Sequence, residues 1–273
     1  MPLTLIKGKI TPQFGRPDGD SVRFVPTNPD LIFTLRRRGR PPKINQNNGS
    51  IQLRYEGIDT MESSALIPFS SNATKANLDF CGTNNGANES AGYVLTNQLG
   101  PNGRPICFIF SGDINQEDGS QVFLDTEQLK HSVNYQMIAA GHAYPLFYDT
   151  LFSDLRDKFS AAIVAARIDG GDMWAADTTN TGTRWPDGDD PVKNITPIFP
   201  KLWRRIQKYS KDEDYFDEAH PFRNLKKYIE LEASERVLIL SKGKITGFDN
   251  VISTTDDTVT LDVAPEDLVV VSK

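Results

Sequence analysis

Histidine and cysteine are scarce in this chain of 273 residues, which holds three histidines and two cysteines. Cys81 and Cys107 are too few for a disulfide framework, and we interpret both as reduced thiols. His131, His142 and His220 are scattered along the sequence. Residues spread in this way offer no ligand cluster, so a zinc centre is excluded, and attention turns to carboxylates and arginines.

Long apolar runs are also absent. No stretch approaches the roughly 18 consecutive apolar residues of a membrane-spanning helix, so we expect no membrane partner. Residues 1–7 lack a charged region followed by a long apolar region, and no secretory signal is visible. We therefore expect a cytoplasmic protein, or a secreted or periplasmic one if a leader has been removed.

Acidic residues outnumber basic ones, which gives a formal net charge of −6. Residues 1–168 carry 16 Lys and Arg against 16 Asp and Glu, whereas residues 169–273 carry 14 against 20. A protein that coats itself with nucleic acid nonspecifically is normally basic, so this class is disfavoured. Because the excess acid lies in the C-terminal part, a polyanion would meet the N-terminal part more easily.

Hydrophobic residues make up 38% of the chain, enough for a sizeable core in one or two domains. In the N-terminal half, short runs rich in Val, Ile, Leu and Phe are separated by Gly, Pro and Asn, which predicts strands. The predicted strands are residues 3–10, 21–26, 31–36, 51–58, 92–95, 106–111 and 121–124, and the predicted helices are 72–80, 125–140 and 151–168. This order is typical of a mainly β protein of the α+β class, a small barrel with packed helices.

Residues 178–194 are polar and rich in turn-forming residues, which is typical of a linker. Helical patterns follow at 199–209 and 221–233, and strand-like runs at 236–241, 244–248, 258–263 and 268–271. We therefore predict a domain over residues 1–177, a linker over 178–194, and a small accessory α+β domain of unknown role over 195–273.

The first candidate cluster is Asp18, Gly19 and Asp20, at the entrance of a predicted strand. Two carboxylates on either side of a glycine can place one oxygen ligand on a hard cation and hold the second close by. The same tripeptide is also an ordinary turn, and that interpretation stays open.

Two further clusters supply arginines and more carboxylates. Arg54 lies on a predicted strand, and Asp59, Thr60 and Glu62 lie in the loop after it. Arg104 follows a glycine before another strand, which alone is also consistent with a tight turn and a solvated arginine. Together, the aspartates can hold a divalent ion, the glutamate can activate water, and the arginines can clamp phosphate oxygens. Phosphodiester hydrolysis needs these groups.

These motifs resemble those of the staphylococcal, or thermonuclease-type, nucleases, in order through most of residues 4–178. The matching segments are Asp-Gly-Asp-Ser-Val at 18–22, Arg-x4-Asp-Thr-x-Glu at 54–62, Ala-Thr-Lys at 73–75, Asn-Gly-Arg at 102–104, Ala-Gly-His-Ala at 140–143 and Met-Trp at 173–174. The resemblance implies an OB-type barrel of five strands with helices, and calcium-dependent hydrolysis of DNA or RNA to 3′-phosphate products.

The resemblance also implies a role for each residue of the three clusters. The implied Ca²⁺ ligands are Asp20, Asp59 and Thr60, with Asp18 as a carboxylate outside the ion's own ligands. The implied catalytic residues are the phosphate-clamping Arg54 and Arg104 and the water-activating Glu62. All of these positions are filled, and all precede residue 105. We therefore expect the accessory domain to be dispensable for chemistry.

Some positions depart from the family pattern. Met61 stands where the family has proline, and Pro101 and Asn102 stand where it has a lysine and a tyrosine that contact a nucleotide phosphate. Phe147 and Tyr148 fall near the positions of its base-stacking tyrosines. These departures favour the alternative function, a catalytically weak or inactive module that binds nucleic acid or a protein partner. The sequence sets neither the oligomeric state nor a preference for DNA or RNA.

An insertion of roughly residues 36–50 carries a run of basic side chains, Arg36, Arg37, Arg38, Arg40 and Lys43. The run resembles the Arg-Gly-Arg-Pro core of AT-hook peptides, whose arginines lie in the narrow minor groove of A·T-rich DNA. It is therefore predicted to be a nucleic-acid-binding arm. The other interpretation is a solvated hairpin tip whose charges prevent edge pairing.

Overall fold

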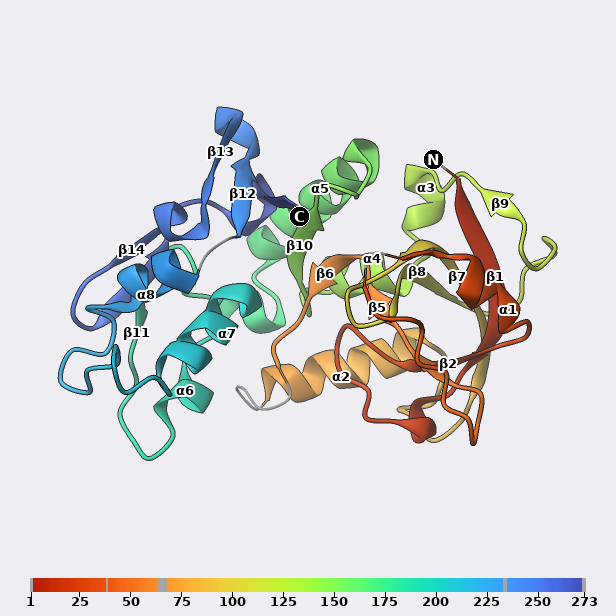
Figure 1. Cartoon of the computed structure of the whole chain (residues 1–273), viewed down its shortest axis with the longest axis horizontal. Helices are drawn as coiled ribbons and strands as arrows, with labels where there is room; N and C mark the ends of the chain where they lie inside the picture. The colour runs from red at the N-terminus through yellow and green to blue at the C-terminus, as the bar shows by residue number, and fades with distance from the viewer. Residues whose placement is uncertain (1, 38, 63–67, 233–234, 272–273) are drawn as a thin grey trace.

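The computed structural model describes residues 2–37, 39–62, 68–232 and 235–271. Its largest sheet contains β1 (Leu3–Ile10), β2 (Arg23–Pro26), β3 (Arg36–Arg37), β4 (Ile51–Gln52), β5 (Arg54–Tyr55), β7 (Ser90–Leu99), β8 (Pro105–Ser111) and β9 (Gln121–Val122). The strand order is β4-β2-β1-β7-β8-β5, with β3 beside β7 and β9 beside β1. This nearly closed, barrel-like sheet lies on the right of Figure 1 and confirms the predicted α+β class.

Helices accompany the barrel-like sheet: α1 (Asp30–Thr34), α2 (Phe69–Phe80), α3 (Thr126–Leu129), α4 (Val133–Ala139) and α5 (Ser153–Asp169). The strand predicted at 31–36 is wrong, because most of it is α1. Its buried residues, Ile32 and Leu35, are three positions apart, which suits a helical turn and not a strand. The single helix predicted at 125–140 is also wrong, because the Ser132 side chain accepts a hydrogen bond from Tyr135 N and starts a second helix.

A second sheet joins the two predicted domains. It runs β13-β12-β16-β10-β6, with β6 (Gly57–Asp59), β10 (Tyr144–Tyr148), β12 (Arg236–Ile239), β13 (Lys244–Gly247) and β16 (Leu268–Val271). β10 pairs antiparallel with β6 and parallel with β16, and Figure 1 shows it in the middle of the molecule. The buried apolar residues form one core that runs from the barrel into the C-terminal part.

The remaining strands and α-helices lie in the C-terminal part, on the left of Figure 1. A small sheet is ordered β11-β15-β14, with β11 (Thr183–Arg184), β14 (Ile252–Thr254) and β15 (Thr258–Leu261), and the helices are α6 (Pro191–Asn194), α7 (Pro200–Tyr209) and α8 (Leu225–Glu232). β11 and α6 fall inside the segment predicted as a linker. Short 3-10 helices occur at Pro12–Phe14, Asp172–Ala176, Leu240–Lys242, Phe248–Val251 and Pro265–Asp267. In the part of the chain that is described, no helix is long and apolar enough to cross a bilayer.

Candidate functional site

The acidic residues of the candidate site come from a turn and a loop that touch. Asp59 is the last residue of β6 and is 2% exposed, and Thr60, which follows it, is also buried. The turn of Asp18, Gly19 and Asp20 packs against Thr60, because a Cβ on Gly19 would lie 2.6 Å from Thr60 Oγ1. Only glycine permits this approach. The structure therefore brings the first cluster of the sequence beside the second.

Asn77, a fully buried residue of α2, holds the turn in place. Its Nδ2 donates to the carbonyl of Asp18 (2.6 Å), and its Oδ1 accepts from Tyr55 Oη (2.7 Å). The backbone N–H of Tyr55 in turn donates to the carbonyl of Asp20 (3.1 Å). The sequence analysis missed Asn77. The one feature that could have indicated it is a side-chain amide at a position that the helical pattern predicts to be buried.

Negative charge accumulates around Asp20. Desolvation raises the pKa of Asp20 well above its ordinary value, and the carboxylates of Asp18 and Asp59 raise it further. Burial alone would lower the pKa of Arg54, but Asp20 and Asp59 outweigh burial, and the pKa of Arg54 is raised. One arginine thus faces several carboxylates, and a further cation near Asp20 would stabilise their charged forms.

Arg54 and Arg104 lie close together because β5 pairs in parallel with the start of β8. Arg104 closes the turn between β7 and β8, where its carbonyl accepts from Gly100 N (2.8 Å). Gly103 in this turn has φ +74°, in the left-handed region that favours glycine. Burial and the nearby charge of Arg54 lower the pKa of Arg104. Two guanidinium groups held together in this way suit an anion such as phosphate.

The basic insertion packs against the turn that carries Arg104. Arg40 N donates to the carbonyl of Pro101 (3.0 Å), and a Cβ on Gly39 would lie 2.5 Å from that oxygen. β3, at the start of the insertion, pairs with the end of β7. The predicted nucleic-acid-binding side chains that are described, Arg36, Arg37, Arg40 and Lys43, are exposed, and Arg38 lies outside the described residues. The insertion therefore supports the turn through its backbone and leaves these charges at the surface.

A residue of the C-terminal part contacts the acidic centre, the name we use for the carboxylates of Asp59 and Glu62. Arg204 on α7 donates from Nη1 to Asp59 Oδ1 (3.0 Å), from Nη2 to Asp59 Oδ2 (2.5 Å), and from Nη1 to Glu62 Oε1 (2.9 Å). Burial alone would lower the pKa of Arg204, but Asp59 and Glu62 raise it above its ordinary value. Sequence reasoning missed Arg204, because it lies 145 positions from Asp59 and belongs to no local motif.

These residues border a cavity of about 440 Å³. Its lining residues are Arg54, Glu62, Gly100, Pro101, Asn102, Arg104, Tyr148, Lys201 and Arg204. Lys201, also on α7, donates to Glu235 Oε1 (2.7 Å), and burial lowers the pKa of Lys201 despite this carboxylate. Both regions of the chain thus supply positive charge to one cavity, which has room for a phosphate group and its sugar.

The residues around Asp20 are of the chemical type that binds a hard divalent cation. Asp20, Asp59 and Thr60 offer oxygen ligands, the type that calcium prefers, and the charge around Asp20 is of the sign that a cation relieves. Within the described ranges, no three Asp, Glu, His or Cys side chains are gathered as a metal-binding group. In the present arrangement both oxygens of Asp59 face Arg204.

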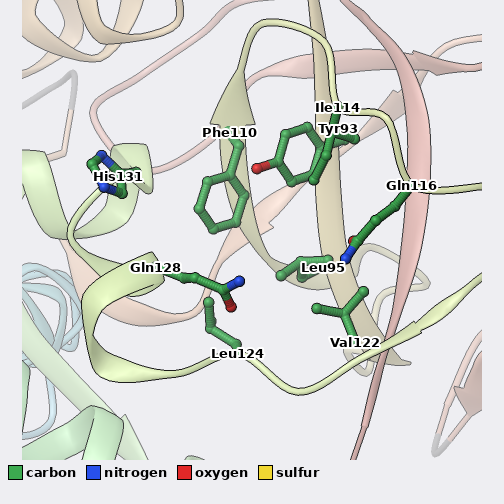
Figure 2. Close-up of a pocket in the computed structure, with 9 residues that line it drawn as sticks. All are labelled: Tyr93, Leu95, Phe110, Ile114, Gln116, Val122, Leu124, Gln128 and His131. Carbon is green, nitrogen blue, oxygen red and sulfur yellow. The ribbon is translucent and has the colours of Figure 1, made fainter.

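Figure 2 shows a second pocket, of about 160 Å³, on the barrel-like sheet. The rings of Tyr93 and Phe110 stack in it with centroids 4.8 Å apart, and Gln116, Gln128 and His131 supply its polar side chains. Among the described residues that line it there is no carboxylate and no arginine. Its described lining therefore differs from that of the first cavity, where arginines and a carboxylate converge.

A comparison with protein-family models finds no match to this chain, and no curated protein matches it either.

Proposed function

We propose that this protein hydrolyses nucleic-acid phosphodiester bonds in a calcium-dependent reaction, as a DNA or RNA endonuclease built on an OB-type barrel. The observation that carries the proposal is the cavity on which Arg54, Arg104 and Glu62 converge, beside the buried carboxylate of Asp59. The motif resemblance to the staphylococcal nucleases supports the same reaction.

In the proposed complex, Arg54 and Arg104 bind the non-bridging oxygens of the phosphate. Two charged N–H donors on one phosphate fix its orientation for in-line attack and stabilise the charge that develops on it. Calcium held by Asp20, Asp59 and Thr60 would add positive charge to the same phosphate. The Asn77 contact to Asp18 keeps the turn that carries Asp20 in position.

Glu62 acts as the base in this proposal, because among the described residues that line the cavity it is the one with a carboxylate. It accepts a proton from water as the water oxygen attacks phosphorus. The bond between phosphorus and the 5′-oxygen breaks, the 5′-oxygen takes a proton from solvent, and the phosphate stays on the 3′-oxygen. Glu62 Oε1 accepts a hydrogen bond from Arg204 in the structure, so this contact must open before that oxygen can take the proton.

The Arg204 contacts also favour a second candidate function. With Asp59 and Glu62 both paired to Arg204, the cavity keeps Arg54 and Arg104 as phosphate ligands, while the carboxylate among its described lining residues is held by a guanidinium. A module of this kind would bind nucleic acid without cutting it.

A plasmid-nicking assay separates the two functions. Supercoiled plasmid is incubated with the full chain in calcium and, in parallel, in chelator, and binding is followed by gel shift. Hydrolysis predicts nicking in calcium only. A gel shift without nicking in either condition would support the binding module and contradict the nuclease.

A further inference from the structure

Arg204 lies where the acidic centre needs a positive charge. Its guanidinium meets both carboxylate oxygens of Asp59 and one oxygen of Glu62. The Asp59 side chain is 2% exposed and that of Arg204 is 33% exposed. Arg204 lines the cavity, whereas Asp59 is not among the described residues that line it. A metal ion bound to Asp59 from this side would need the same oxygens.

We propose that Arg204 and calcium compete for Asp59, so that the C-terminal part of this chain sets how much calcium the site requires. The inference rests on the proposed function, since it takes calcium as the ion that acts there. Two cations at the same carboxylate repel each other and need the same oxygens, so each weakens the binding of the other. The coupling is reciprocal by thermodynamic necessity.

The helix that carries Arg204 is firmly held. Trp203, the preceding residue, is 1% exposed, and its Nε1 donates to the carbonyl of Val192 (2.9 Å). Arg205, the following residue, donates to Glu235 Oε2 (2.5 Å). Competition therefore does not require α7 to unfold. The guanidinium alone can turn away from Asp59, because it already borders the cavity of about 440 Å³.

The competition is tested by calcium binding to the full chain, measured by isothermal titration calorimetry with calcium chloride and no nucleic acid. Arg204→Gln removes the tethered cation, and we expect calcium to bind about tenfold more tightly or better. Arg205→Gln is the matched control, because it removes the same charge from the next residue of the same helix, which donates to Glu235. Its calcium affinity should stay near that of the wild type.

Adding Asp59→Asn to Arg204→Gln should abolish the gain, which places the ion at Asp59. Circular dichroism checks that each variant is folded, and Arg204→Lys replaces Arg204→Gln if the latter does not fold. Lysine keeps the charge but cannot donate to both oxygens of Asp59 in parallel, so a smaller gain is expected.

The possible results separate the two proposals. Equal calcium affinity in the wild type and in both Arg204 variants would overturn the competition and leave the calcium-dependent function standing. A failure of all three proteins to bind calcium would overturn the competition and the proposed calcium site together.

Discussion

The two regions that meet at the cavity are specified in different ways. In the N-terminal part, Asp20, Asp59 and Arg104 stand in short motifs whose turns fix them locally, as the close approach of Gly19 to Thr60 shows. In the C-terminal part, Arg204 belongs to an ordinary amphipathic helix and meets Glu62 across 142 positions of sequence. Local motifs thus supply the groups of the proposed site, whereas the long-range packing of α7 brings Arg204 onto Asp59 and Glu62.

Removing the C-terminal region is expected to have the largest effect on the molecule. The sequence predicts that residues beyond 177 are dispensable, but β16 pairs with β10, and the ring of Phe199 contacts that of Tyr144 (6.3 Å between centroids). Truncation after Asp177 exposes this apolar surface, and we expect an aggregated product without cooperative unfolding. Size-exclusion chromatography and thermal denaturation provide the check. A soluble, cooperatively folded fragment would show that the barrel region stands alone.

Substitution of single residues of the proposed site is expected to have the second largest effect. Glu62→Gln removes the proposed base and Arg104→Ala one phosphate contact, and each should lower turnover on plasmid by at least about 10²-fold while the fold is kept. Glu117→Gln, at an exposed position, is the control and should leave turnover unchanged. Near-normal activity in either site variant would remove that residue from the proposed mechanism.

Elements set by local signals were predicted well. The strand predicted at 3–10 is β1, and the helix predicted at 151–168 is α5, which Gly170 ends in the left-handed conformation (φ 65°). β10 was missed, because Pro145 interrupts its pattern of strand-forming residues.

The same contrast between locally specified and missed features holds for the candidate site. The structure brings the predicted residues Arg54, Glu62 and Arg104 to one cavity, because each follows or lies on a strand of recognisable pattern. Asn77 and Arg204 were missed, since a buried amide and a helix arginine look like many others until their partners are known. Sequence alone therefore indicated the groups of the proposed site and left out Asn77 and Arg204, which contact them.

Glu56 is a buried carboxyl group that has no role in the proposed site, and it allows a prediction about stability and pH. Burial raises the pKa of Glu56 to about 7, against the opposing charge of Arg54. A carboxyl with a raised pKa in the folded state costs stability as pH rises from the unfolded pKa of about 4.5 through 7. The cost reaches about 3 kcal/mol at pH 8, since one pKa unit is about 1.4 kcal/mol.

Glu56→Gln should remove most of this cost, so that the variant is more stable than the wild type at pH 8 and similar to it near pH 4. Denaturant unfolding at several pH values measures the difference, and the exposed Glu117→Gln serves as the control. A variant less stable than the wild type at pH 8 would show that the Glu56 carboxylate is needed in its charged form.

The smallest effect on chemistry is expected from the basic insertion, which touches the site through its backbone. Changing Arg36, Arg37, Arg40 and Lys43 to glutamine should weaken binding to long duplex DNA, because their exposed side chains can meet phosphates. For each phosphate that is no longer bound, the slope of log affinity against log salt falls by about 0.9 on B-DNA. Filter binding over a range of salt concentrations gives this slope. Cleavage of a dinucleotide, too short to reach these side chains, should barely change.

Gly39→Ala supplies the contrasting variant for the same segment. It keeps every charge, but its Cβ would lie 2.5 Å from the carbonyl of Pro101, so the turn that carries Arg104 must shift. Dinucleotide cleavage should then fall while the salt slope on duplex DNA stays at the wild-type value. If the glutamine variant instead loses dinucleotide and duplex cleavage equally, its side chains support the turn. An unchanged salt slope in that variant would show that the insertion binds no DNA.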